Sequence, residues 1–267
     1  MKREGFFWKG INMNIIIGIV MKPFLTSQIT GSLWKDLYVK QDFTDILSTY
    51  NATSIGIIPQ GISLDRENGN DIDLSKEKEL TDVEKNHLIS QINLCDGLIL
   101  QGGLSSHKYE VFIAQYAIEH NIPILGICAG FNNIARAIGT EVEYDEELIE
   151  KHDIYSSKCC HPVIIQKNAK VLLQEELSDE VISVNSIHSM TLHKCAVHTN
   201  ERINVEAIAK DSGIWGIPKV TVEAFSVKDT KFCLAVKWHP ELLPDNKVTT
   251  TIFRKFIEAC KRFNQEI

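Results

Sequence analysis

The stretch that decides the fold of this chain is Ile122-Pro-Ile-Leu-Gly-Ile-Cys128-Ala-Gly-Phe-Asn-Asn-Ile-Ala135. Its first half is a short apolar run of the kind found in buried parallel strands, and a helical stretch follows at once. Cys128 stands at the junction, with one glycine two residues before it and another two residues after it. This is the nucleophile-elbow pattern, which requires those glycines because a Cβ there would clash with the neighbouring strand or helix.

The position of Cys128 predicts a reactive thiol. The residue that opens the helix lies at the positive end of the helix dipole, which favours the thiolate and lowers the thiol pKa. The alternative interpretation is a small cysteine that fills the core behind a buried strand. The two interpretations differ in whether the chain also supplies a base and hydrogen-bond donors for this thiol.

The first half of the chain repeats the same alternation of strand and helix. Buried strands without polar alternation are expected at 15–20, 54–58, 97–100 and 122–127. Helices are expected at 32–50, 78–94, 108–120 and 128–138, and a polar surface loop at 61–78. Such alternation implies βαβ units with right-handed crossovers. It predicts an α/β three-layer sandwich with a central, mostly parallel sheet.

The second half predicts a partly antiparallel C-terminal extension of that sheet. Strand-like segments separated by turns occur at 163–165, 181–184, 205–210, 221–225 and 232–237. A final amphipathic helix is expected over 248–263. The sequence contains no internal repeat and no low-complexity linker. We therefore expect an N-terminal extension at 1–13, ahead of a single domain at 14–267.

Composition excludes several classes of protein. Of the 267 residues, 44% are apolar and 24% are charged, which is typical of a globular protein and not of a disordered or collagen-like chain. A net charge of −7, from 28 basic and 35 acidic residues, gives no general attraction for nucleic acid or anionic membrane. The seven cysteines form no CxxC pair, which favours a reducing, cytoplasmic location. No apolar run reaches the roughly 18 residues of a transmembrane helix.

Gln101-Gly102-Gly103 follows the apolar run at 97–100. A diglycine lets the backbone approach a ligand closely. If this strand lies beside the one that leads to Cys128, the N–H groups of Gly103 and Ala129 can point at one position and form an oxyanion hole. The alternative is an ordinary turn after a strand.

Trp238-His239-Pro240-Glu241 closes the last predicted strand. Residues two apart in an extended backbone point to the same side, so Glu241 can hold the imidazole of His239. An imidazole within reach of Cys128 would take its proton and later return it to a leaving amine. The alternative is a structural histidine with a capping glutamate before the last helix.

These three motifs, in this order, resemble the class I glutamine amidotransferase-like superfamily, whose triad is Cys–His–Glu. Within it, the chain is most similar to the γ-glutamyl-γ-aminobutyrate hydrolase group, peptidase family C26. The supporting stretches are Ile17-Gly-Ile-Val-Met-Lys-Pro23 and Val184-Asn-Ser-Ile-His188-Ser-Met190. The resemblance implies a flavodoxin-like fold, a catalytic triad of Cys128, His239 and Glu241, and chemistry that needs no cofactor.

The same resemblance places Gly102, Asn132, His188 and Ser189 near the substrate. Two of these positions depart from the family pattern. Asn132 stands where a glutamine is usual, four residues after the nucleophile, and Ser189 and Met190 replace a histidine and a glutamine. These departures leave the identity of the substrate open.

The predicted function is hydrolysis of γ-glutamyl amide bonds in small molecules through a glutamyl thioester on Cys128, and the expected ligand is a small γ-glutamyl compound or glutamine. One alternative is a glutaminase subunit that supplies ammonia to a separate synthetase. Another is a catalytically silent binding protein on the same scaffold. A homodimer is compatible with the sequence.

Metal binding is not expected. His193-Lys-Cys195-Ala-Val-His198 and Cys159-Cys160-His161 place candidate ligands close together, but no second ligand group with familiar spacing follows.

Overall fold

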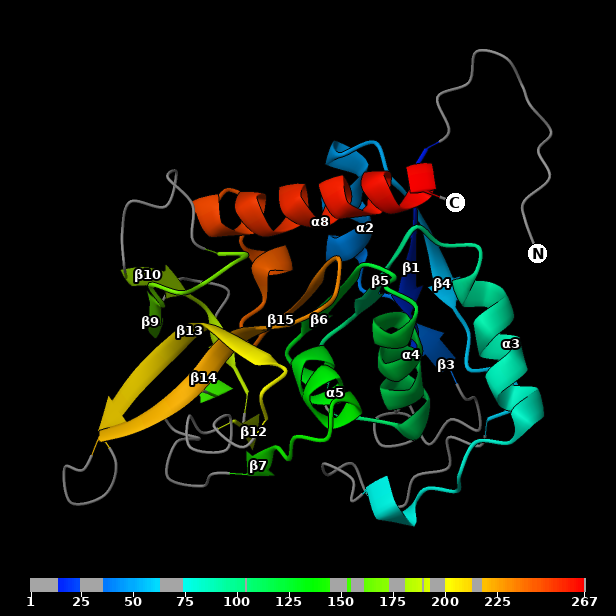
Figure 1. Ribbon diagram of the computed structural model, residues 1–267, viewed down its shortest axis with the longest axis horizontal. Coiled ribbons are helices and arrows are strands. Elements are labelled where there is room, and N and C mark those ends of the chain that lie inside the picture. Colours follow the sequence, from blue (N-terminus) through cyan, green and yellow to red (C-terminus); the bar gives the residue numbers. More distant parts are fainter. Residues whose placement is uncertain are drawn as a thin grey trace.

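A nine-stranded sheet in the order β10-β9-β13-β14-β15-β6-β5-β1-β4 forms the centre of the computed structural model (Figure 1). The structure describes residues 14–24, 36–62, 74–103, 105–144, 153–154, 161–172, 181–188, 190–192, 200–212 and 218–266. Five neighbouring strands are parallel: β15 (Cys233–Val236), β6 (Ile124–Ile127), β5 (Gly97–Leu100), β1 (Ile16–Val20) and β4 (Thr53–Ile57). Four antiparallel strands extend the sheet: β14 (Pro218–Val227), β13 (Ile203–Ser212), β9 (His161–Ile165) and β10 (Val181–Val184).

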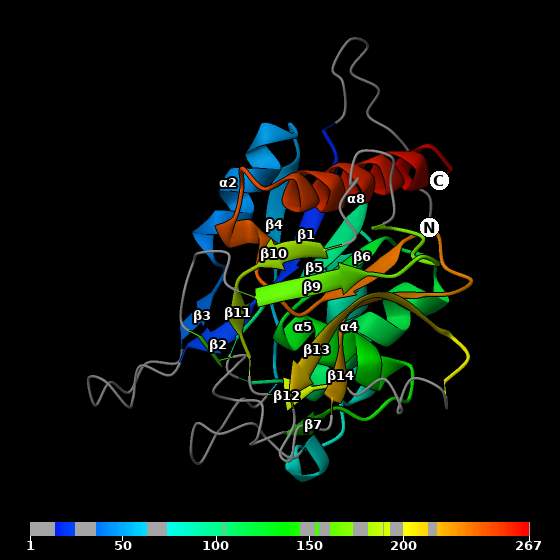
Figure 2. The same cartoon turned by 90° about the vertical axis from the view of Figure 1, so that its left-hand side faces the viewer.

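Helices cover both faces of the parallel part. On one face lie α2 (Gln41–Thr49) and α8 (Lys247–Glu266), and on the other α3 (Asp82–Ile92), α4 (Lys108–Glu119) and α5 (Ala129–Ala137) (Figures 1 and 2). Each face has its own apolar core. In β5, Ile99 packs with the α2 and α8 side, whereas Leu98 and Leu100 pack with the α3, α4 and α5 side. Because side chains alternate between two buried faces, the strand shows no polar alternation in the sequence.

Short elements complete the architecture. Three two-stranded ribbons pair β2 (Lys22–Phe24) with β3 (Asp36–Tyr38), β7 (Glu143–Tyr144) with β12 (Met190–Thr191), and β8 (Asp153–Ile154) with β11 (Ser186–Ile187). Two 3-10 turns are η1 (Leu74–Lys76) and η3 (Pro240–Leu242). The β13–β14 hairpin projects from the rest of the sheet (Figure 1).

The predicted α/β fold is confirmed, and the four strands of the first half lie within two residues of their predicted bounds. The last predicted strand, at 232–237, becomes β15, which pairs in parallel with β6 and so belongs to the central part of the sheet. The predicted extension at 1–13 lies outside the described residues, and the single domain at 14–267 stays a prediction. Among the described residues, no helix has the length and apolar character needed to cross a bilayer.

The helix predicted over 32–50 is wrong in part. Residues 36–38 form β3, and the helix begins only at Gln41. The side chain of Gln101 provides the reason: its Nε2 donates to the carbonyls of Val20 and Tyr38, both at 2.9 Å, while its Oε1 accepts from the backbone N–H of Lys40 at 3.1 Å. These contacts hold 38–40 in an extended conformation that helical periodicity alone does not anticipate.

A buried carboxylate ties the antiparallel extension together. Glu206, on β13, is fully buried, and its two oxygens accept from the backbone amides of residues 170, 171 and 172 at 2.8–3.0 Å. Oε1 also accepts from Asn204 Nδ2 at 2.9 Å and from Ser226 Oγ at 2.6 Å. Five donors around one side chain compensate for the cost of burying a charge.

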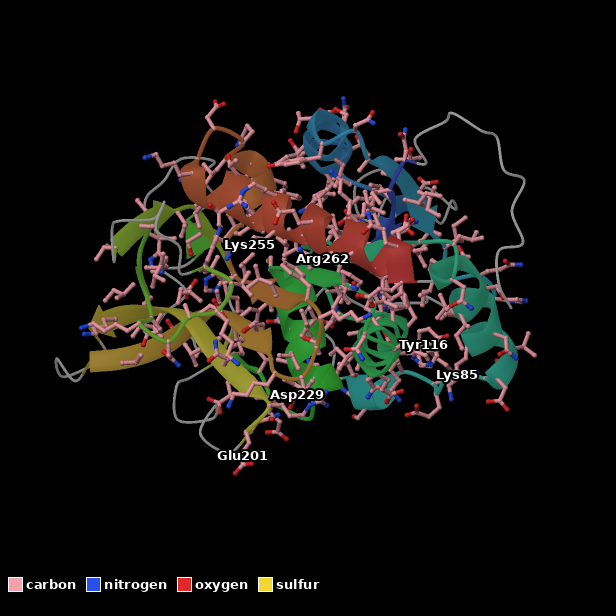
Figure 3. The ribbon with its side chains drawn as sticks, turned by 45° about the horizontal axis from the view of Figure 1, so that its top comes forward. Lys85, Tyr116, Glu201, Asp229, Lys255 and Arg262 are labelled. Atoms are coloured by element: carbon pink, nitrogen blue, oxygen red, sulfur yellow. The ribbon has the colours of Figure 1, made fainter. Side chains whose placement is uncertain are left out.

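We predict that Glu206→Gln lowers the free energy of unfolding by about 2–4 kcal/mol, because the amide presents an N–H₂ group to donors and leaves several of them unsatisfied. The measurement is urea unfolding followed by circular dichroism. The matched control is Glu201→Gln, since Glu201 is exposed and lies at the rim of the molecule (Figure 3). Equal stability of the two variants would contradict the role of the Glu206 network.

Candidate active site

The three sequence motifs end at one edge of the sheet. Strands β15, β6 and β5 are parallel neighbours, so their carboxyl ends meet there. Val236 pairs with Ile127, and the backbone N–H of Cys128 donates to the Val236 carbonyl at 2.9 Å. The residues that follow each strand, including Cys128 and His239, are thereby brought together across more than a hundred positions of sequence.

The turn at Cys128 has the strained geometry of a nucleophile elbow. Cys128 is the N-cap of α5, with φ +54° and ψ −104°, a backbone conformation that is unfavourable for residues with a side chain. A Cβ on Gly126 would lie 2.6 Å from the Gly130 carbonyl oxygen, and one on Gly130 would lie 2.1 Å from the Leu100 carbonyl oxygen. The close approach of α5 to β5 and β6 therefore requires both glycines, as the sequence predicts.

Gly102 marks the point where the motifs converge. A Cβ on Gly102 would lie 2.5 Å from His239 Cε1 and 3.1 Å from Cys128 Cβ. His239 and Cys128 thus both lie against Gly102, close enough for their charges to interact, and His239 Nδ1 lies 2.7 Å from Glu241 Oε1. All three side chains are buried. The structure therefore brings the predicted thiol, imidazole and carboxylate together at one point beside Gly102.

Asn185 holds the backbone of His239, a contact that sequence reasoning missed. Its Oδ1 accepts from the His239 N–H at 2.8 Å, and its Nδ2 donates to the His239 carbonyl at 2.9 Å. This pair of hydrogen bonds fixes the backbone of His239 directly before η3, the turn that contains Glu241. Asn185 lies within a quoted stretch of the family resemblance, but no local pattern assigns it a partner so far along the chain.

The electrostatics of the site favour a thiolate on Cys128. Burial opposes ionisation of the thiol, but the His239 charge and hydrogen bond, with the positive charges of Lys237 and Lys40, lower the pKa of Cys128 to about 7. Burial likewise opposes protonation of His239, but Cys128 and Glu241 together raise the pKa of His239 to about 10. Between these values, Cys128 and His239 form a thiolate–imidazolium pair.

Other buried cysteines show the opposite behaviour. Burial raises the pKa of Cys233 to about 12 and that of Cys260 well above its ordinary value. Neither thiol ionises at neutral pH, so neither resembles a nucleophile. The low pKa of Cys128 thus comes from its neighbours and not from burial as such.

Asn132 and His188 are buried close to Cys128, each held by other protein groups. Asn132 Oδ1 accepts from Lys237 Nζ at 2.6 Å. His188 Nε2 lies 3.5 Å from Glu223 Oε2, and the carbonyl of the preceding Ile187 lies 3.6 Å from Cys128 Sγ. Their contact with substrate stays a prediction.

The remaining predicted positions have different outcomes. Gly103 adjoins Lys22, and Ala129 is the first residue of α5, so both lie at the right edge of the sheet. Their part in an oxyanion hole stays a prediction. Ser189 lies outside the described residues, as do the candidate metal ligands at 193, 195, 198, 159 and 160. Within the described ranges, no group of three or more His, Cys, Asp or Glu side chains could hold a metal ion.

Comparison with known families gives a match to the peptidase C26 model over residues 104–241, which include Cys128, His239 and Glu241. The chain belongs to the peptidase C26 family. This membership covers the half of the chain that carries the proposed triad. The protein is accordingly an enzyme domain of the C26 and glutamine amidotransferase kind, as the sequence resemblance predicted.

Similar curated proteins include two CTP synthases. That of Pyrococcus abyssi is 24% identical over 216 residues, which are 70% of this chain and 38% of that protein. That of Borreliella burgdorferi is 25% identical over 189 residues, which are 62% of this chain and 35% of that protein. The chain thus matches little more than a third of the length of these relatives.

Similar solved structures share the fold. The glutaminase domain of Trypanosoma brucei CTPS, with bound acivicin, has a TM-score of 0.60 at 16% identity and covers 93% of this chain and 94% of that one. A Thermoplasma acidophilum protein assigned as a GMP synthase subunit has a TM-score of 0.56 at 19% identity, covering 96% and 98%. At such identities the likeness supports the class I glutamine amidotransferase fold and nothing finer.

We predict that alkylation of Cys128 by iodoacetamide rises with pH through a midpoint near 7, because only the thiolate reacts and its pKa is lowered to about 7. In His239→Gln the midpoint should move above about 8.5, the ordinary range for a thiol, since burial remains and the main compensating charge is gone. Peptide mapping by mass spectrometry assigns the modified residue. His120→Gln, an exposed position on the far end of α4, is the control and should leave the midpoint unchanged. An unshifted midpoint in His239→Gln would contradict the pairing.

Proposed function

We propose that this protein hydrolyses the γ-amide of L-glutamine, with Cys128 as nucleophile. The observation that carries the proposal is the placement of Cys128 beside His239, whose Nδ1 lies 2.7 Å from Glu241 Oε1, with the thiol on a glycine-flanked turn at the N-terminus of α5. A lowered thiol pKa beside a protonated imidazole is the arrangement required for nucleophilic attack followed by proton transfer. None of these three side chains needs a metal ion or a cofactor to act.

The proposed reaction has two steps. The Cys128 thiolate attacks the amide carbon, and the N–H groups of Gly103 and Ala129 stabilise the oxyanion. The C–N bond then breaks, His239 gives its proton to the departing ammonia, and a γ-glutamyl thioester remains on Cys128. In the second step, neutral His239 takes a proton from water as the water attacks the thioester, which releases glutamate and the thiolate. Glu241 holds the imidazole in place and stabilises its charged form throughout.

We favour glutamine over other γ-glutamyl amides as the substrate because of the proteins to which this chain is similar. The curated proteins that match are CTP synthases, and one structural neighbour is a glutaminase domain. These likenesses support the alternative of the sequence analysis, a glutaminase that supplies ammonia to a separate synthetase, more than its main prediction. The match to little more than a third of each CTP synthase is also what a glutaminase portion alone would give.

Hydrolysis of a small γ-glutamyl amide other than glutamine is the second candidate. It is supported by membership of the peptidase C26 family and by the departure at Asn132, whose amide is held by Lys237. The two candidates share every step up to the leaving group. They differ only in whether ammonia or a larger amine departs, so a product assay separates them.

We predict that the wild type releases glutamate from L-glutamine or from a γ-glutamyl amide, and that Cys128→Ala lowers kcat/KM by about a thousandfold or more, since the covalent step is lost. Liquid chromatography with mass spectrometry measures glutamate and identifies the amine. Hydroxylamine in the same assay should yield γ-glutamyl hydroxamate, because it intercepts the thioester. Cys233→Ala, which removes a buried thiol of raised pKa, is the matched control and should keep turnover. Equal turnover by the wild type and Cys128→Ala would reject the proposal.

A further inference from the structure

Three lysines surround the carboxyl edge where Cys128 lies, and two of them have ammonium groups bound by acceptors within the protein. Lys22 Nζ is 2.7 Å from Glu110 Oε1 and donates to the Ser105 carbonyl at 2.6 Å, with the side chain 2% exposed. Lys237 Nζ donates to Asn132 Oδ1 and to the Met190 carbonyl, both at 2.6 Å. Both ammonium groups are therefore fixed by internal partners, as buried charges must be.

Lys40 differs from these two. Its side chain is only half-buried, and no described carboxylate or carbonyl accepts a hydrogen bond from its Nζ. The hydrogen bond between Lys40 and a described side chain is made by the Lys40 backbone N–H, which donates to Gln101 Oε1. An ammonium near the site without an internal counter-charge is available to a ligand.

The backbone of Lys40 is bound to the segment that leads to Gly103, the predicted oxyanion-hole residue. Gln101, which binds the Lys40 N–H, immediately precedes Gly102 and Gly103 and is itself fully buried. The helix that follows Lys40, α2, packs against η3, the turn that carries Glu241 (Figure 2). Lys40 is therefore joined to the segment that precedes the diglycine, and the helix that it precedes packs on the turn that carries Glu241.

The side chain of Lys40 starts from a backbone that is bound to Gln101, next to the Gly102 that contacts Cys128 and His239. Its positive charge contributes to lowering the pKa of the Cys128 thiol, alongside the larger effects of His239 and Lys237. A long, half-buried side chain that starts there can extend toward a small substrate bound at Cys128. In a γ-glutamyl compound, three carbon atoms separate the α-carboxylate from the amide carbon that Cys128 attacks. A cation that binds this carboxylate must therefore lie near the sulfur but not in contact with it.

We propose that Lys40 binds the α-carboxylate of the substrate and thereby selects γ-glutamyl compounds with a free α-carboxylate. This inference rests on the proposed function, since it assumes that the bound acyl group is γ-glutamyl. Lys40 is the cation that the described part of the site leaves without an internal partner, and a charge-assisted hydrogen bond in a partly buried place is strong. The departures at positions 132 and 189 from the family pattern are consistent with carboxylate recognition placed elsewhere.

The test compares three reagents that alkylate Cys128. These are 6-diazo-5-oxo-L-norleucine, which carries an α-carboxylate, its methyl ester, which does not, and iodoacetamide, which has no amino-acid portion. Rates are measured for wild type, Lys40→Met, Lys40→Arg and the exposed control Lys167→Met, at a pH where Cys128 is fully ionised in each. At that pH, any influence of Lys40 on the thiol pKa no longer affects the comparison.

The expected result is selective. Lys40→Met should lower the rate of alkylation by the carboxylate reagent by about 10- to 100-fold, as expected for the loss of a hydrogen bond to a charged group. The rates with the other two reagents should change by less than about twofold. Lys40→Arg should keep most of the rate, and Lys167→Met all of it.

Three other results would overturn the inference and are distinguishable. If wild type prefers the carboxylate reagent to its ester and Lys40→Met keeps that preference, Lys40 is not the carboxylate-binding residue and the proposed function stands. If wild type shows no such preference, both the proposed γ-glutamyl substrate and the role of Lys40 are rejected. An equal loss with all three reagents in Lys40→Met would assign Lys40 a structural role only.

Discussion

The backbone of Cys128 is held at a positive φ between β6 and α5 because Gly126 and Gly130 remove the side chains that would occupy the same space. This constraint aims the sulfur at the carboxyl edge of the sheet and places it at the start of a helix. The parallel pairing of β15 with β6 then brings His239 to the same edge. Every proposed step of the chemistry depends on this one turn and the strand beside it.

The charges around the turn are arranged so that Cys128 ionises readily, unlike the buried thiols of Cys233 and Cys260. His239 is stabilised in its charged form by Glu241 on one side and the Cys128 thiolate on the other. Asn185 fixes the His239 backbone through both its N–H and its carbonyl, which limits the freedom of the imidazole. Buried thiols without such neighbours, such as Cys233, have a raised pKa instead. The site is therefore made reactive by its surroundings, at a cost in backbone strain.

Local sequence signals were enough to predict the fold and the proposed triad. The elbow, the diglycine and the His-Pro-Glu motif each follow a short apolar strand, and parallel strands bring their ends together by topology. Asn185 and Gln101 were missed because their partners lie far away in the sequence, where no periodicity reaches. The same tertiary contacts made the helix prediction at 32–50 too long, since Gln101 holds 38–40 extended. The substrate contacts at Gly102, Asn132, His188 and Ser189 stay predictions, and the departures from the family pattern at positions 132 and 189 leave the sequence without a signal for the identity of the substrate.

The central claim is that Cys128 and His239 form an ion pair at neutral pH. The most direct measurement is the protonation state of the His239 ring, followed by ¹⁵N NMR across a pH titration of the selectively labelled protein. We expect the ring to stay protonated well above neutrality and to titrate near pH 10, because the Cys128 thiolate and Glu241 raise its pKa to about 10. A ring that loses its proton near pH 6.5, as an isolated histidine does, would contradict the account.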